Sequence, residues 1–107
     1  MYYVYILRCE GDMLYTGYTN DVNKRFSAHS DGTGAKFTRS HKPLGLEAIW
    51  CTEDKHTALS LEWHMKHISR EKKLAIIADD SRLAELLGDE LAEGAERIYD
   101  LPENLST

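Results

Sequence analysis

Side chains that can bind phosphate, hold a hard cation or move a proton recur along the first 62 residues. Tyr5 and Tyr15 are ten residues apart, and Arg25 follows Tyr15 by a further ten. His29 lies four residues after Arg25, and Glu62 falls in a stretch with helical spacing. A guanidinium can bind phosphate through two parallel hydrogen bonds, and a carboxylate is a ligand for hard divalent cations. Taken singly, each tyrosine is as well explained by its propensity for β-strands, so the ordered set carries the information.

A basic loop follows these residues. Residues 31–43 carry two glycines, Lys36, Arg39 and a further lysine, with no apolar period, which predicts a loop. Lys36 and Arg39 are suited to contacts with the phosphate backbone, which give affinity that depends on salt and not on sequence. They indicate a nucleic-acid partner.

The formal net charge of −5 is unevenly distributed and does not exclude that partner. Residues 1–78 hold eleven Lys and Arg against nine Asp and Glu, a net of +2. Residues 79–107 hold two against nine, a net of −7. The acidity therefore belongs to the C-terminal part of the chain.

The elements that position these residues begin with a β-hairpin. Residues 2–7 and 13–18 are β-branched and aromatic runs, and residues 10–12 are turn material. Asn20 or Asp21 can cap a helix that would carry the arginine and the first histidine.

A third strand and two helices are predicted next. Residues 44–52 have the composition of a strand, Asp54 can cap a helix, and Ser69 can cap a second, shorter one. The apolar stripe of the first helix consists of Ala58, Leu61, Met65 and Ile68. We therefore predict an α+β fold with a small three-stranded antiparallel sheet flanked by helices.

Two parts of the chain are distinguished by this pattern. Residues 1–78 are predicted to form the folded domain, and residues 79–107 an acidic helical C-terminal extension. The extension has helical spacing at Leu83, Leu86, Leu87 and Leu91. Packing of these leucines on the core is the simpler interpretation; competition with nucleic acid for the basic face, or self-association, are alternatives that leave the oligomeric state open.

The order of the candidate residues resembles that of the GIY-YIG endonuclease family. Its two tripeptides correspond to Y-V-Y at residues 3–5 and Y-T-G at residues 15–17, followed by Arg25 and His29. A later helix of that family carries a glutamate, which Glu62 matches. The resemblance covers roughly residues 1–78 and is closest to the small, stand-alone, single-domain branch.

The tripeptides depart from the family pattern at three positions. Tyr3 replaces the first glycine, and Val4 and Thr16 replace the two isoleucines. The tyrosines themselves, Tyr5 and Tyr15, are intact.

The resemblance implies a role for each matching residue. Glu62 would hold one Mg²⁺ (or Mn²⁺), and Arg25 would bind the charge that develops on the phosphate. Tyr15 would activate the water, Tyr5 would orient the water or the phosphate, and His29 would relay the proton.

Three structural alternatives are weighed beside these roles. Glu62 and Lys66, four residues apart, could be a surface ion pair. His64 and His67 are better explained as helix-surface residues than as metal ligands. Both cysteines are expected to be free thiols without a role.

The resemblance implies a metal-dependent endonuclease that hydrolyses DNA phosphodiester bonds, with DNA favoured over RNA, and we expect it to be structure-selective and linked to DNA repair or recombination. The alternative is a non-catalytic module on the same fold that binds nucleic acid or protein. We expect a cytoplasmic protein without a membrane partner, because no apolar run approaches the roughly 18 residues of a bilayer span and no secretory signal is evident.

Overall fold

The computed structural model of the chain describes residues 1–25 and 40–99. Its centre is a β-hairpin of β1 (Tyr2–Cys9) and β2 (Met13–Thr19), which pair antiparallel as predicted. The turn places Gly11 and Asp12 at φ of 78° and 57°. Positive φ costs glycine little and aspartate less than most residues, so the sequence at this turn suits its backbone.

The third predicted strand is confirmed as β3 (Pro43–Thr52), which pairs antiparallel with β1. The prediction of a three-stranded sheet is wrong, however. A fourth strand, β4 (Glu96–Arg97), pairs antiparallel with β3 and gives a sheet in the order β2-β1-β3-β4. Two residues are too few to display the alternation by which a strand is recognised, so this segment was included in the helical extension.

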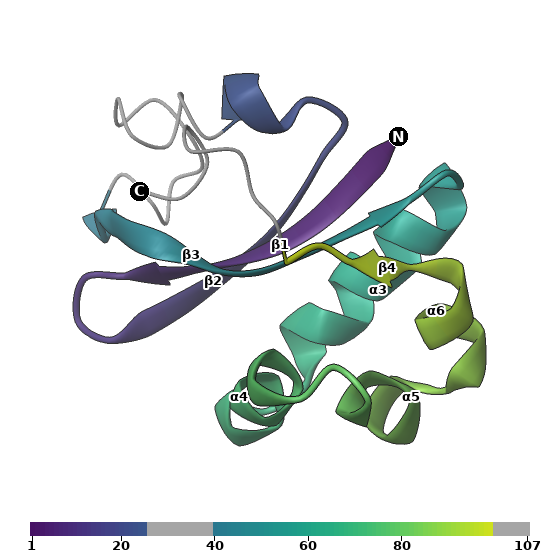
Figure 1. The fold of residues 1–107 in the computed structure, drawn as a ribbon. Helices are drawn as coiled ribbons and strands as arrows, with labels where there is room; N and C mark the ends of the chain where they lie inside the picture. The colour runs from purple at the N-terminus through teal and green to yellow at the C-terminus, as the bar shows by residue number, and fades with distance from the viewer. Residues whose placement is uncertain (26–39, 100–107) are drawn as a thin grey trace.

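Helices pack on one face of the sheet, as Figure 1 shows for α3 (Lys55–His67), α4 (Arg70–Ala78), α5 (Arg82–Leu87) and α6 (Asp89–Gly94). The predicted caps are confirmed at the first two. Asp54 accepts a hydrogen bond from the backbone N–H of Thr57 (3.1 Å), and Ser69 accepts one from that of Lys72 (3.2 Å). Among the described residues, no helix is both long and apolar enough to cross a membrane.

The main core lies between these helices and the sheet. Ala58, Leu61 and Met65 of α3 are fully buried against Val4, Ile6, Ala48 and Trp50 of the strands. Leu83 of α5 is 1% exposed and belongs to the same cluster. The described part of the acidic extension is therefore packed on the sheet and helices of residues 1–78; the division at residue 78 itself stays a prediction.

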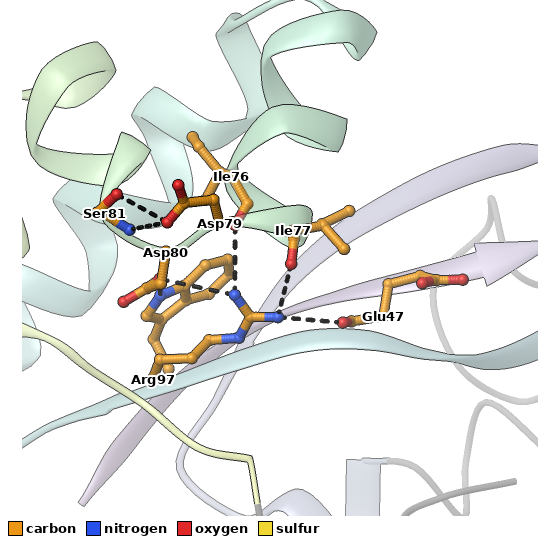
Figure 2. Close-up of polar contacts among 8 residues, drawn as sticks. Glu47, Ile76, Ile77, Asp79, Asp80, Ser81 and Arg97 are labelled. Atoms are coloured by element: carbon orange, nitrogen blue, oxygen red, sulfur yellow. Dashed lines mark hydrogen bonds and ion pairs between the residues drawn. The ribbon is translucent and has the colours of Figure 1, made fainter.

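Arg97 joins the extension to the core (Figure 2). Its guanidinium donates to the carbonyl oxygens of Ile76 (3.3 Å) and Ile77 (3.2 Å), at the C-terminal end of α4. It also lies 3.7 Å from Asp80 Oδ1 and 5.2 Å from the centre of the Trp50 ring, while Asp80 accepts the indole N–H of Trp50 at 2.7 Å. The positive charge thus meets the negative end of the helix dipole.

The opposite face of the sheet carries a second, smaller cluster, which we call the tyrosine face. It is formed by Tyr5, Leu7, Cys9 and Ile49, all buried. Figure 1 shows the helical turn of residues 22–25 on this side of the sheet, opposite α3. Because β1 is central and covered on both faces, its residues Val4 to Leu7 are all buried.

Candidate active site

Tyr5 and Tyr15 lie next to each other on the tyrosine face. In the hairpin register Tyr5 is opposite Gly17 and Tyr15 is opposite Leu7. Residues directly opposite each other in an antiparallel pair project to the same side of the sheet, as do residues two apart on one strand, such as Tyr5 and Leu7. Both phenols therefore lie on the face of the sheet that is turned away from α3. The ring centroids are 6.4 Å apart with the planes tilted by 48°. The observed register of the hairpin therefore brings the two tyrosines together.

Gly17 makes room for the Tyr5 ring. A Cβ atom at Gly17 would lie 2.5 Å from both the hydroxyl oxygen and Cζ of Tyr5. No side chain fits at that separation, so the phenol end of Tyr5 crosses β2 directly over the glycine backbone. Sequence reasoning gave Gly17 no role, although its place in the second tripeptide was the available signal.

Both tyrosines have pKa values above the ordinary one for a phenol. Burial is the main cause of the raised pKa of Tyr5, followed by the neighbouring Tyr15, while Arg25 opposes the shift. Burial also raises the pKa of Tyr15, but Lys66 and Arg25 lower it and Glu62 raises it. The two phenols therefore share the fields of the same cation, Arg25, and the same anion, Glu62.

Arg25 lies in the first turn of a helix whose N-terminus is capped by hydrogen bonds. Asp21 is the cap: its carboxylate accepts the backbone N–H of Lys24 (3.1 Å), and its carbonyl oxygen accepts that of Arg25 (3.0 Å). Thr19 fixes Asp21 in turn, since its hydroxyl oxygen accepts the Asp21 backbone N–H at 3.0 Å. A hollow of about 300 Å³ lies here, lined by Thr19, Asn20, Asp21, Lys24 and Arg25.

Glu62 lies on α3, which packs on the other face of the sheet and contacts both β1 and β2, and its charge acts on both tyrosines. Its carboxylate lies 3.3 Å from the ammonium of Lys66, one turn further along the helix. The Glu62 side chain is 21% exposed and that of Lys66 is 47% exposed. The ion pair considered from the sequence is present, but both charges also act on Tyr15, which the spacing alone did not indicate.

The donor atoms at this site suit a cation that needs few protein ligands. Mg²⁺ keeps several waters and is often bound by one or two carboxylates together with substrate phosphate. Glu62 supplies a half-buried carboxylate, and no group of three His, Cys, Asp or Glu side chains that could hold a metal occurs among the described residues. Glu62 with waters and a phosphate oxygen therefore fits a hard divalent cation better than a zinc site.

His64 and His67 both form hydrogen bonds within α3. Each Nδ1 donates to the carbonyl oxygen four residues earlier, at 2.8 Å to Ser60 and 2.6 Å to Trp63. Three further predicted residues, His29, Lys36 and Arg39, lie outside the described residues, and their roles stay predictions.

Comparison with known proteins identifies the family. The family model described as the GIY-YIG catalytic domain matches residues 1–75, which include both tyrosines, Arg25 and Glu62. The chain belongs to the GIY-YIG family. Nucleases of this family act on nucleic acid and generally depend on a divalent metal.

Several relatives share this domain. The protein is 44% identical to UPF0213 protein BH0048 of Halalkalibacterium halodurans over 77 residues, which is 72% of this chain and 82% of that protein. It is 46% identical to UPF0213 protein HQ_3675A of Haloquadratum walsbyi over 72 residues, covering 67% of this chain and 81% of that one. The structure of this chain superposes on the solution NMR structure of UPF0213 protein BH0048 from Bacillus halodurans with a TM-score of 0.50. The match covers 73% of this chain and 84% of the chain in the NMR structure.

Proposed function

We propose that this GIY-YIG protein is a divalent-metal-dependent endonuclease that hydrolyses phosphodiester bonds in DNA, in preference to RNA. One observation carries the proposal: a guanidinium and a carboxylate, from two helical segments, both act on two phenols that lie side by side on neighbouring strands. Phosphodiester hydrolysis needs a nucleophilic water, neutralisation of phosphoryl charge and stabilisation of the departing oxygen. This set of side chains can supply each requirement.

Arg25 binds the scissile phosphate in this mechanism. Its planar fork matches two phosphoryl oxygens and carries a permanent charge, so it stabilises the extra negative charge of the transition state. The hollow that Arg25 lines together with Lys24 and Thr19 leaves room for a phosphate on this side of the site. Glu62 holds the cation, which when bound polarises the phosphate and stabilises the departing oxygen.

The two tyrosines have different tasks because their environments differ. Tyr5 is 1% exposed and its pKa is raised by burial, so it stays a neutral phenol that donates or accepts one hydrogen bond. Tyr15 is less buried, and Lys66 and Arg25 oppose the increase in its pKa. Tyr15 is therefore the better candidate to take a proton from the attacking water, with Tyr5 orienting that water.

Binding without cleavage is the alternative, and one observation favours it. The raised pKa of Tyr15 keeps its phenol protonated near neutral pH, which makes it a poor base there. On that alternative the same site would retain a phosphate without turnover.

Cleavage of a panel of single-stranded, duplex, nicked, flap and branched DNAs tests the proposal. We expect cutting in the presence of Mg²⁺ or Mn²⁺ and none in a chelator. Glu62→Gln, which keeps the size of the side chain, should abolish cutting while the fold is retained. Glu71→Gln, on the exposed side of α4, is the matched control and should cut like the natural chain. Binding to these DNAs without cutting by the natural chain under all conditions would establish the binding module instead.

A further inference from the structure

Trp63 is a large aromatic side chain left in solvent beside the candidate site. It is 57% exposed, whereas the other tryptophan, Trp50, is 1% exposed and hydrogen-bonded to Asp80. Trp63 directly follows Glu62 on α3. An exposed indole therefore lies on the same helical turn as the proposed metal ligand.

The indole is braced by two imidazoles. The His67 ring stacks on it with centroids 4.1 Å apart and planes 23° from parallel, and the His64 ring meets it edge-on at 5.1 Å. Both imidazoles are fixed by hydrogen bonds from Nδ1 to backbone carbonyl oxygens of the helix. We call Trp63, His64 and His67 the aromatic platform. A second ring placed against Trp63 would meet a surface whose orientation is already set.

Trp63 lies about 100° around α3 from Glu62, on the side turned away from the buried residues Leu61 and Met65. Successive helical residues are rotated by about 100°, so Lys66 projects between the direction of Glu62 and that of Trp63. A strand bound at Glu62 and continuing outward would pass the Lys66 ammonium before reaching the indole.

The charge of this helical segment fits a polyanion. Residues 55–73 hold five Lys and Arg against two Glu, in addition to three histidines. Lys66 and Arg70 have side chains 47% and 43% exposed. The ion pair of Arg70 with Asp12 lies at the surface, where such pairs contribute little, so a phosphate can replace the carboxylate of Asp12. An aromatic ring next to exposed cations is the combination that binds single-stranded nucleic acid.

We infer that the aromatic platform stacks an unpaired nucleobase of the strand whose phosphate lies at the Arg25 and Glu62 site. This inference rests on the proposed function and narrows its substrate class. A base inside a duplex has both faces covered by its neighbours, so it cannot stack on an indole. The substrate is therefore a strand with an unpaired nucleotide a few positions away from the scissile phosphate, as in a flap, a gap or a single strand.

Tryptophan fluorescence tests this directly. The probe is a single-stranded oligothymidylate, compared with the same strand annealed to its oligoadenylate complement, both without divalent metal so that no cleavage occurs. We expect the single strand to quench the emission of the natural chain and the duplex to quench it much less. Because Trp50 is buried, the quenched part of the emission should be absent in Trp63→Phe.

Affinity for the single strand provides the second readout. Stacking of one base on an aromatic side chain implies that Trp63→Ala weakens binding by roughly five- to a hundredfold. Leu59→Ala is the matched control: it is a similarly exposed apolar residue (41%) one turn earlier on α3, and its loss should change the affinity less than twofold. Circular dichroism of each variant checks that the fold is kept.

The possible outcomes separate this inference from the proposed function. Metal-dependent cleavage without any effect on Trp63 emission would overturn the inference and leave the nuclease intact. Quenching by the single strand without cleavage under any condition would support the platform and refute the nuclease. Equal losses of affinity in Leu59→Ala and Trp63→Ala would mean that α3 presents a general apolar docking surface, as for a protein partner, and would also overturn the inference.

Discussion

The phenol of Tyr5 crosses the edge strand β2 directly over the backbone of Gly17, its opposite residue in the hairpin. A Cβ at position 17 would lie 2.5 Å from the Tyr5 hydroxyl oxygen and 2.9 Å from Cε2. The absence of a side chain at Gly17 therefore leaves the space that the hydroxyl of Tyr5 occupies, and the ring of Tyr5 lies there with its centroid 6.4 Å from that of Tyr15.

Replacing Gly17 by alanine should both destabilise the protein and displace Tyr5. Forcing a methyl group into a filled space costs about 1–3 kcal/mol in the free energy of unfolding. Urea unfolding of Gly17→Ala measures that cost, and the cleavage rate should fall with it because the phenol must move. Gly45→Ala is the control: no atom lies within 4 Å of its added Cβ, so its stability should stay within about 0.5 kcal/mol of the natural chain. Equal stability of the two variants would show that Tyr5 does not need this space.

Arg25→Lys keeps the charge beside the tyrosines but removes the planar fork. If Arg25 binds the phosphate in the transition state, the cleavage rate of this variant should fall by about a hundredfold, as when one preorganised donor is lost. Lys24→Gln removes a full charge from the neighbouring exposed residue and should reduce the rate only a few-fold, through weaker binding. Single-turnover cleavage at saturating DNA separates the two effects. A larger effect from Lys24→Gln would mean that charge alone, and not the fork of Arg25, serves the reaction.

Cleavage should accelerate with pH if Tyr15 is the base. The active form is the phenolate, and because burial raises the Tyr15 pKa above its ordinary value of about 10, that form increases about tenfold per pH unit through the neutral and mildly alkaline range. The logarithm of the single-turnover rate should therefore rise with a slope of about one, and Tyr15→Phe should remove the pH-dependent part.

Lys66 should shift the dependence of the cleavage rate on pH. Its ammonium is the largest influence that lowers the Tyr15 pKa, so Lys66→Gln should raise the pKa and slow cleavage at every pH below it. Lys66→Arg, which keeps the charge, should restore most of the rate. Lys55→Gln removes a different exposed lysine of α3 and should leave the profile unchanged. An unaltered profile in Lys66→Gln would mean that Lys66 only pairs with Glu62 at the surface.

The features that the sequence predicted correctly are those determined locally. Asp54 and Ser69 were predicted as caps because a cap needs only its own side chain and the next three residues, and both make the expected hydrogen bonds. The buried stripe of α3 was predicted for the same reason, since helical spacing alone decides which residues share a face. The order of the tripeptides, Arg25 and Glu62 indicated the family, which the match over residues 1–75 confirms.

The features that were missed depend on residues distant in the chain. The strand Glu96–Arg97 exists because it pairs with Trp50 and Cys51, more than forty residues earlier, and no pattern within the segment reports that pairing. The lowering of the Tyr15 pKa by Lys66 likewise depends on how α3 packs against β2. The sequence showed only that Lys66 lies four residues after Glu62.

Arg97 provides the test of how firmly the C-terminal segment is joined to the rest. Its side chain is 7% exposed, and its guanidinium donates to Ile76 and Ile77 at the end of α4 (Figure 2). Arg97→Ala leaves those carbonyls and the Asp80 carboxylate without their cation, so the free energy of unfolding should fall by about 2–4 kcal/mol. Arg82→Ala removes the exposed partner of Glu85 and should cost less than about 1 kcal/mol. Urea unfolding compares the two; similar losses would mean that Arg97 is not an anchor, whereas the expected difference would make residues 79–99 part of the cooperative unit that holds β3 beneath the tyrosine face.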